Sequence, residues 1–302
     1  MKRQTKKMKN HNYKTLKFKK VKTPKANCSP DANDPSRFSC LKDPDLMLLK
    51  RLWNSKNSNN QIHSNDPKIV WQQLNNFMSG KCEKETCWMK QTFVDNKTKH
   101  LLLSSRFAPI APQEWIKNPN EWLSSDEITE VMEQYESKYK CFKFIGPTPI
   151  DFDTKLKHGE CVWEEMCNFN LAEYMKQGKT KFGISINTDT HDKDGEHWVS
   201  VFINLKKKEI FYYDSAGSNI PRKVKRFVDR VINQAKQLGI VLKFDQNYPL
   251  AHQYKNTECG VYSLFFMIHM LEDKITCDYL KTHVIKDEYI ETFRNIFFNQ
   301  DL

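Results

Sequence analysis

The chain has 302 residues, of which 39% are hydrophobic and 12% aromatic, and its formal net charge is +11. This length predicts one large domain or two ordinary ones with a sizeable core. No apolar run reaches the ~18–20 residues of a membrane span, and the N-terminus lacks the apolar stretch of a secretory signal. We therefore expect a soluble protein that is made in a reducing compartment.

The positive charge is concentrated in the first 25 residues, which contain eleven Lys or Arg and no acid. The rest of the chain holds 37 of the 48 basic side chains and all 37 acidic ones, so those formal charges cancel. Such a tail attracts nucleic acid or an anionic surface without reading sequence. The alternative is a solvated extension that aids solubility, and composition leaves both interpretations open.

Composition and pattern divide the chain into three expected parts. Residues 1–38 are rich in Lys, Asn, Ser and Pro with few apolar anchors, which predicts a disordered basic tail. Residues 39–111 are expected to form a helical accessory region, with helices near 43–53 and 67–74 that begin at acidic or Pro-bearing positions. Residues 112–302 carry the strongest patterns and are expected to form the main domain.

Nine cysteines at scattered spacings, an odd number, argue against a disulfide framework and favour buried thiols. Cys82 and Cys87 lie five residues apart, which raises the question of a zinc site. That spacing is at the edge of the usual range and no second Cys/His pair follows it, so packing under a loop is favoured. We expect no metal and no cofactor.

The main domain alternates helical and strand patterns. Ser124 or Ser125 is predicted to cap a helix with Glu127 in its first turn, running to about residue 140. The other expected helices cover residues 171–177, 221–238, 259–268 and 287–298. The expected strands cover residues 142–145, ended by Gly146-Pro147, then 182–186, 197–205, 209–213 and 241–244. This order predicts a sheet flanked by helices.

The strands 197–205 and 209–213 are predicted to form a hairpin across the charged turn 206–208. The first of them is apolar on both faces, as a central strand should be. If Ile203 pairs with Lys208, His197 and Asp214 lie directly opposite each other, with Cβ atoms ~4.5–5.5 Å apart. A slip of one residue would place the two side chains on opposite faces.

Cys259 begins a segment that is almost wholly apolar after its first turn, so it is predicted at the N-terminus of a buried helix. The helix dipole and an imidazolium from His197 would favour its thiolate, and Asp214 would orient that ring. Gln253 would donate to an oxyanion, and Gly260 would leave room for the substrate carbonyl. Each residue alone also has a structural interpretation, such as a core cysteine or a turn aspartate. Their combination predicts a cysteine protease.

These residues resemble the adenovirus-type and SUMO-protease superfamily of cysteine peptidases. The resemblance rests on His197-Trp198, Asp214-Ser215, Gln253 with Glu258-Cys259-Gly260, and Trp122-Leu123. It implies an α+β fold with a central mixed or antiparallel sheet and the nucleophile on a buried helix. It also implies the base, orienting acid, oxyanion donor and nucleophile roles given above.

The resemblance further implies that Trp122 and Trp198 pinch a narrow channel, which favours Gly-Gly or Gly-X-Gly-like sequences before the cut. Two departures stand out: Glu258 replaces an Asp that is frequent in the family, and Ser124-Ser125 replaces the Asn-Asp of the Trp-Leu-Asn-Asp motif. The N-terminal part, with residues 38–41 and 82–88, looks more like the processing proteases of large cytoplasmic DNA viruses, of the African swine fever type and their giant-virus relatives.

That resemblance implies a thiol endopeptidase that trims capsid or core precursors during virion maturation, in the virion and in the viral factory of the host cytoplasm. One alternative keeps the chemistry but removes SUMO or ubiquitin from host conjugates, with the nucleus as a possible location. An alternative of another class is a nucleic-acid-binding structural protein that carries an inactive protease fold.

Overall fold

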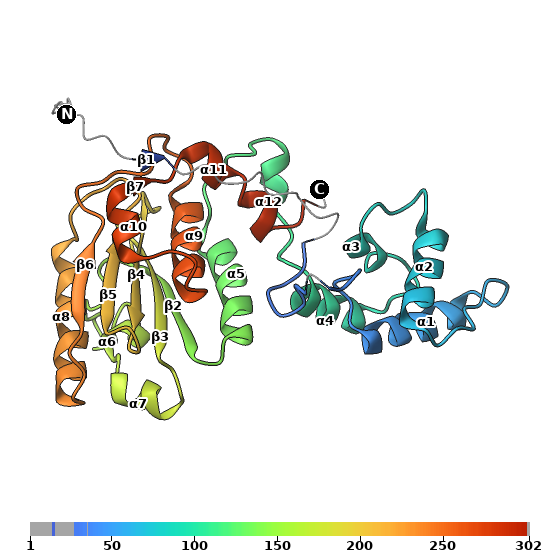
Figure 1. Ribbon diagram of the computed structural model, residues 1–302, viewed down its shortest axis with the longest axis horizontal. Coiled ribbons are helices and arrows are strands. Elements are labelled where there is room, and N and C mark those ends of the chain that lie inside the picture. Colours follow the sequence, from blue (N-terminus) through green and yellow to red (C-terminus); the bar gives the residue numbers. More distant parts are fainter. Residues whose placement is uncertain (1–13, 16–26, 35, 301–302) are drawn as a thin grey trace.

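The computed structural model describes residues 14–15, 27–34 and 36–300. These residues form a small helical region and a larger domain with a sheet, which lie side by side (Figure 1). Most of the predicted basic tail, including nearly all of residues 1–25, lies outside the described residues. In the part of the chain that is described, no helix has the length and apolar character needed to cross a membrane.

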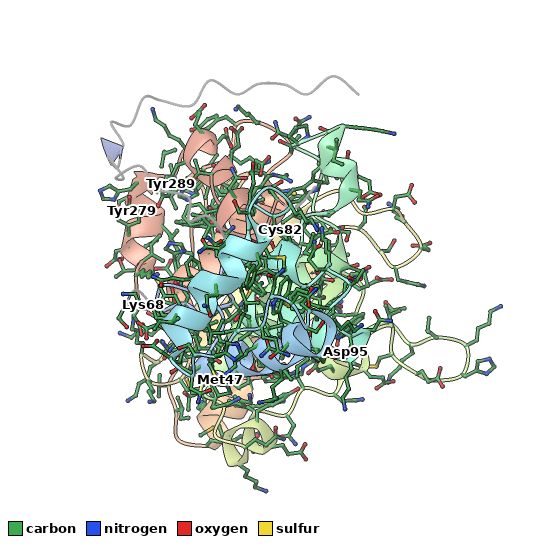
Figure 2. The ribbon with its side chains drawn as sticks, turned by 90° about the vertical axis from the view of Figure 1, so that its right-hand side faces the viewer. Met47, Lys68, Cys82, Asp95, Tyr279 and Tyr289 are labelled. Carbon is green, nitrogen blue, oxygen red and sulfur yellow. A yellow bond between two sulfur atoms is a disulfide. The ribbon has the colours of Figure 1, made fainter. Side chains whose placement is uncertain are left out.

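The helical region contains four helices, and it confirms the two that were predicted there. Its elements are α1 (Asp43–Lys56), α2 (Pro67–Met78), α3 (Glu85–Trp88) and α4 (Asn96–Arg106). The Asp66 carboxylate caps α2 by accepting from the Lys68 amide at 2.8 Å, and Pro67 fits the first turn. Trp53 of α1 stacks on Phe77 of α2 with ring centroids 4.9 Å apart. Viewed end-on, this region lies in front of the larger domain (Figure 2).

The expectation of free thiols is wrong for six of the nine cysteines. The structure joins Cys28 to Cys40, Cys82 to Cys87, and Cys161 to Cys167, with Cα–Cα distances of 5.1, 5.4 and 6.3 Å. These distances lie within the reach of a disulfide, and the paired cysteines are 12, 5 and 6 residues apart in the sequence. The free cysteines are Cys141, Cys259 and Cys277.

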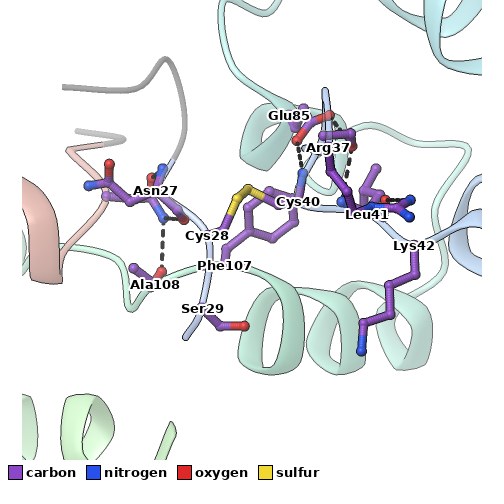
Figure 3. Close-up of a disulfide and its surroundings, with 12 residues drawn as sticks. Asn27, Cys28, Ser29, Arg37, Cys40, Leu41, Lys42, Glu85, Phe107 and Ala108 are labelled. Atoms are coloured by element: carbon purple, nitrogen blue, oxygen red, sulfur yellow. Dashed lines mark hydrogen bonds between the residues drawn. A yellow bond between two sulfur atoms is a disulfide. The ribbon is translucent and has the colours of Figure 1, made fainter. Parts of the chain in front are cut away.

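Residues 27–34 are packed against the rest of the protein, although the sequence predicted a disordered tail as far as residue 38. The Asn27 amide donates to Oδ1 of Asn299 at 2.8 Å, and Nδ2 of Asn299 donates back to the Asn27 carbonyl at 2.9 Å. The same Nδ2 also reaches the Ala108 carbonyl at 2.9 Å. Figure 3 shows Asn27 against Ala108, next to the Cys28–Cys40 disulfide. Segments from opposite ends of the sequence therefore meet at the junction of the two parts.

The larger domain is built on a five-stranded mixed sheet, which confirms the predicted α+β class. Its strands lie in the order β2-β3-β4-β5-β6, with parallel pairing at both edges and antiparallel pairing in the middle. Their bounds are Phe142–Pro149, Lys181–Asn187, Trp198–Asn204, Glu209–Tyr213 and Lys243–Gln246. The central position of β4 explains why this strand is apolar on both faces.

Strand β2 continues past Gly146-Pro147, where the sequence predicted its end. The register with β3 shifts between Ile145 and Thr148, and pairing then resumes as Thr148 with Ile186. A proline is tolerated here because β2 is an edge strand and the irregularity absorbs its missing donor.

The hairpin register differs from the predicted one by two residues. Ile203 pairs with Ile210 rather than with Lys208, because the turn is longer and Lys208 adopts a positive φ of 58°. A shift of two residues keeps every side chain on its face, since the strand period is two. His197 and Asp214 therefore still lie on the same face, although they are not directly opposed.

Helices cover both faces of the sheet (Figure 1). On one face lie α5 (Ser125–Lys138) and α9 (Cys259–Leu271), packed on the aromatic side chains of β2, β4 and β5. On the other lie α6 (Glu164–Cys167), α7 (Leu171–Lys176) and α8 (Arg222–Gln237). The predicted cap is confirmed: Ser124 and Glu127 form a capping box at α5. Nearly all of α9 is buried, as its apolar sequence predicts.

The C-terminal segment is more broken than predicted. In place of one helix over 287–298 there are α11 (Asp287–Glu291) and α12 (Arg294–Phe297), and α10 (Cys277–Thr282) precedes them. A short strand β7 (His283–Val284) pairs with β1 (Lys14–Thr15), and a 3₁₀ turn η1 covers Gln113–Ile116. Figure 1 shows α11 at the top of the sheet domain near α9, and α12 on the side of that domain that faces the helical region.

Candidate active site

Cys259 is the first residue of α9 and is 3% exposed. The apolar helix that follows is held against β4, β3 and α5, so its N-terminus is fixed relative to the sheet. At that end the unpaired amides and the helix dipole favour negative charge. The structure therefore places the only thiol of α9 where a thiolate is stabilised.

His197 and Asp214 meet at the end of the β4–β5 hairpin, with His197 Nε2 2.7 Å from Asp214 Oδ1. His197 directly precedes β4, and Asp214 directly follows β5. The carboxylate is 3% exposed and accepts two further hydrogen bonds, from the amides of Ala216 at 2.8 Å and Ser218 at 3.3 Å. The turn after β5 thus holds the acid in one orientation toward the ring.

His197 also interacts with Cys259. Because Nε2 is bonded to Asp214, Nδ1 is the ring nitrogen that is available to the sulfur. Burial disfavours a charged ring, but the hydrogen bonds to Asp214 and Cys259, with the negative charge of both partners, outweigh it and raise the pKa of His197 to about 10. A protonated imidazole beside the sulfur is the arrangement that supplies a thiolate at neutral pH.

Gln253 is tied to the turn that carries Asp214. Its Oε1 accepts a hydrogen bond from the Ser215 hydroxyl at 2.7 Å, and its backbone amide donates to the Ser215 carbonyl at 2.8 Å. With the oxygen of the amide engaged, the NH₂ group is the end that can donate to a developing oxyanion. The predicted tetrad is thus gathered on two neighbouring loops and one helix N-terminus.

Asn247 is a contributor that sequence reasoning missed. It is buried, and its Oδ1 accepts from the Asp214 amide at 2.9 Å while its Nδ2 donates to the Asp214 carbonyl at 2.7 Å. The same Nδ2 donates to the carbonyl of Leu250 at 2.8 Å. The backbone of Asp214 is therefore held by hydrogen bonds at both its amide and its carbonyl. A single Asn in a polar loop carries no signal for this role in the sequence.

Trp122 and Trp198 both line a groove that contains His197, and a hydrogen bond holds Trp198 against the residue that follows Trp122. The indole nitrogen of Trp198 donates to the Leu123 carbonyl at 2.9 Å, while Trp122 remains 42% exposed. A groove of about 420 Å³ begins at these two rings and His197 and continues along the loop 189–196. A larger cavity of about 820 Å³ lies between α4 and α5, away from these residues. The groove, and not the larger cavity, leads to the imidazole beside the sulfur.

The structure gives a different reason for a glycine at position 260 from the one predicted. A Cβ on this residue would come within 2.7 Å of Leu123 Cβ, so the space is filled by protein rather than left for a substrate carbonyl. The glycine lets Leu123 pack against the first turn of α9. Through Leu123 it also sets the position of the segment that carries Trp122 and accepts from Trp198.

Comparison with known proteins finds relatives of this chain. Residues 183–301 match the model of the Ulp1 protease family, C-terminal catalytic domain, a range that includes all four predicted catalytic residues. Over these residues the chain is similar to a Ulp1-type peptidase domain. It is 25% identical over 293 residues to R355 of Acanthamoeba polyphaga mimivirus, which is named as a thiol protease, covering 90% of this chain and 92% of that one.

A second relative is a cysteine protease of African swine fever virus, 26% identical over 249 residues, which cover 76% of this chain and 89% of the relative. The crystal structure of a protease from the same virus has the same fold, with a TM-score of 0.68 and 22% identity, covering 93% of this chain and 98% of that one. The match extends well beyond the peptidase domain. The chain is a cysteine protease. The mimivirus relative and the African swine fever virus structure each match it over nearly its full length.

Proposed function

We propose that this protein is a thiol endopeptidase in which Cys259 attacks the peptide carbonyl, His197 is the general base, Asp214 orients His197, and Gln253 stabilises the oxyanion. The observation that carries the proposal is the continuous set of contacts from Asp214 through His197 to Cys259, with Gln253 held by Ser215 beside it. The thiolate adds to the carbonyl carbon, and the imidazolium gives its proton to the leaving amine as the C–N bond breaks. The neutral His197 then takes a proton from the water that hydrolyses the thioester, which releases the acid product and frees Cys259.

The proposed substrates are structural or core precursors of a virus, cut at Gly-containing sites during particle maturation. Two observations support this: relatives from two large DNA viruses match most of the chain, and the groove at His197 starts between Trp122 and Trp198. A strand segment without side chains passes most easily between two large rings. The proposed locations are the virion and the cytoplasmic viral factory.

The test is mass spectrometry of peptides released from candidate structural proteins by the wild-type chain and by Cys259→Ala. Cys141→Ala, at another free and partly buried cysteine, is the matched control. Peptides that end in Gly, released by wild type and Cys141→Ala but not by Cys259→Ala, are expected. Release by Cys259→Ala at the wild-type rate would end the proposal.

A second candidate function is the removal of SUMO or ubiquitin-like proteins from conjugates. The Ulp1 family match favours it, and several African swine fever virus relatives are named SUMO-1 cysteine protease. SUMO and ubiquitin probes with a C-terminal electrophile decide between the two functions. Covalent labelling of Cys259 by either probe favours deconjugation, and cleavage of precursors without labelling favours processing.

Nucleic-acid binding by the basic tail stays a prediction of the sequence. Salt-sensitive DNA binding should disappear when residues 1–25 are deleted, while cleavage of a short peptide continues unchanged. A Cys259→Ala chain that retained every measurable activity would favour a structural protein with an inactive protease fold.

A further inference from the structure

A buried ion pair lies directly behind the nucleophile. Glu258, the residue before Cys259, accepts a hydrogen bond at Oε2 from Nε of Arg294 at 2.9 Å. The side chains of Glu258 and Arg294 are 0% and 5% exposed, which makes this pair less exposed than any other ion pair in the described part of the chain. Removing two charges from water is costly, so a pair of this kind is weak evidence for stability alone.

The pair connects distant elements. Arg294 begins α12, and its guanidinium lies over the ring of Trp115 in η1, 4.6 Å from the centroid. Trp115 in turn packs edge-on against Phe298, with centroids 5.0 Å apart. The cation is therefore held by an aromatic ring on one side and by the Glu258 carboxylate on another. Contacts with Trp115 and Glu258, rather than contacts with solvent, therefore fix the position of the guanidinium.

The Glu258 side chain does not cap the helix that it precedes. Glu258 is the N-cap of α9, but its carboxylate makes no capping hydrogen bond to the helix. It accepts instead from Arg294 and, at Oε1, from the Thr257 hydroxyl at 3.1 Å. The Glu258 carbonyl meanwhile accepts the first helical bond, from the Tyr262 amide at 2.8 Å. Both the backbone and the side chain of this residue are thus fixed next to Cys259.

The pair also leaves one polar group unsatisfied. Nη1 of Arg294 is buried and has no hydrogen-bond partner among the described residues. A buried donor without a partner lowers the free energy of unfolding. Stability alone therefore does not explain why an arginine occupies this position. An apolar side chain at both positions would avoid that cost.

We propose that Glu258 and Arg294 are positioning residues. Their ion pair holds Cys259 in line with His197, and Arg294 neutralises the Glu258 carboxylate next to the reactive sulfur. The pair fixes the backbone from which the Cys259 side chain projects. Arg294 also offsets a negative charge that would otherwise stand one residue from the thiolate and oppose it. This inference rests on the proposed role of Cys259 as the nucleophile.

Other charged groups on the elements near Cys259 must be distinguished from the Glu258–Arg294 pair. His197 and Asp214 approach from the hairpin, and Glu258 with Arg294 lie behind the first turn of α9. Asp287 of α11 accepts from the amides of residues 254 and 255 through Oδ2. Because the hairpin pair and Asp287 are unchanged by a substitution at Arg294, a change in Cys259 reactivity reports on the Glu258–Arg294 pair itself.

The experiment follows alkylation of the full-length protein by iodoacetamide as a function of pH, with each cysteine quantified by mass spectrometry. Cys141 and Cys277 are internal references in the same molecule. Arg294→Lys keeps the charge but loses the forked geometry, and Glu258→Gln keeps the shape but loses the charge. Arg294→Lys weakens the hold on the segment before Cys259, so we expect Cys259 alkylation at neutral pH to slow by about tenfold. Glu258→Gln removes the negative charge and leaves the Arg294 cation beside the sulfur, so we expect alkylation to change in the opposite direction.

Glu258→Asp keeps the charge one methylene shorter and should recover much of the wild-type Cys259 rate. Arg106→Lys is the matched control, because Arg106 Nε lies 2.6 Å from Asp45 Oδ2 in a partly buried pair of the helical region. It should lower the melting temperature without changing the Cys259 rate. If Arg294→Lys does not fold, Glu258→Gln and Glu258→Asp carry the same comparison.

Wild-type alkylation of Cys259 across the pH range in folded Arg294→Lys or Glu258→Gln would overturn the inference. A different result would overturn the proposed function: wild-type Cys259 reacting no faster than Cys141 and Cys277 would deny it a nucleophilic role. The two failures are therefore distinguishable within one data set.

Discussion

Ser215 donates its hydroxyl hydrogen to Oε1 of Gln253 at 2.7 Å, and this contact joins the Gln253 loop to the turn that carries Asp214. His197, Asp214 and Gln253 consequently share one rigid support. Cys259 comes from a separate element, the N-terminus of α9. Reaction geometry then depends on how well that helix is fixed against the hairpin.

Ser215→Ala should weaken oxyanion stabilisation without removing the donor. The Gln253 amide loses the hydrogen bond that orients it, so we expect kcat to fall by about tenfold, less than the roughly 10²–10³ expected for Gln253→Ala. KM should change little because substrate binding is not altered. Steady-state kinetics on a peptide identified by mass spectrometry would measure this. Equal losses for the two variants would contradict the positioning role of Ser215.

Asn247→Ala should reduce both stability and activity. Removing the side chain leaves the buried amide and carbonyl of Asp214 unpaired, at a cost of about 1–3 kcal/mol each in the free energy of unfolding. Denaturant titration and kcat per folded molecule would be measured together. Asn54→Ala is a matched control, because Asn54 clamps the backbone of Ile62 in the same two-sided way at 2.9 and 2.8 Å. It should lower stability and leave kcat unchanged.

The raised pKa of His197, about 10, predicts a specific pH dependence. The folded value exceeds the ordinary value of about 6.5, so the stabilising contribution is fully present below that pH and is lost as the pH rises through about 10. Melting temperatures measured between these limits should fall less steeply in His197→Gln than in the wild type. In Cys259→Ala the NMR titration of the ring should move to lower pH, because one negative partner is gone. An unchanged titration would contradict the contact.

Gly260→Ala should destabilise the protein through a collision with Leu123. The added Cβ would stand 2.7 Å from Leu123 Cβ, and displacing that side chain should cost about 1–3 kcal/mol in the free energy of unfolding. The double variant Gly260→Ala with Leu123→Ala should be more stable than the sum of the single effects predicts. Additive losses would show that Leu123 is not what excludes a side chain at residue 260.

Much of the fold was accessible from local patterns. The capping box at Ser124 and Glu127, the apolar run after Cys259 and the amphipathic α8 are each encoded within a few turns of chain. The site residues followed from a chain order of residue types whose chemistry is interdependent. The face shared by His197 and Asp214 survived an error of two residues in register, because strand side chains alternate with period two.

The sequence by itself determined which chemistry this protein can carry, because the reactive groups and the helix and strand periodicities are properties of short segments. The tertiary structure decided the clamp of Asn247 on Asp214 across 33 residues and the pairing of Glu258 with Arg294 across 36. Those contacts depend on how distant elements pack. No local pattern records which buried polar group will find which partner once the core has closed.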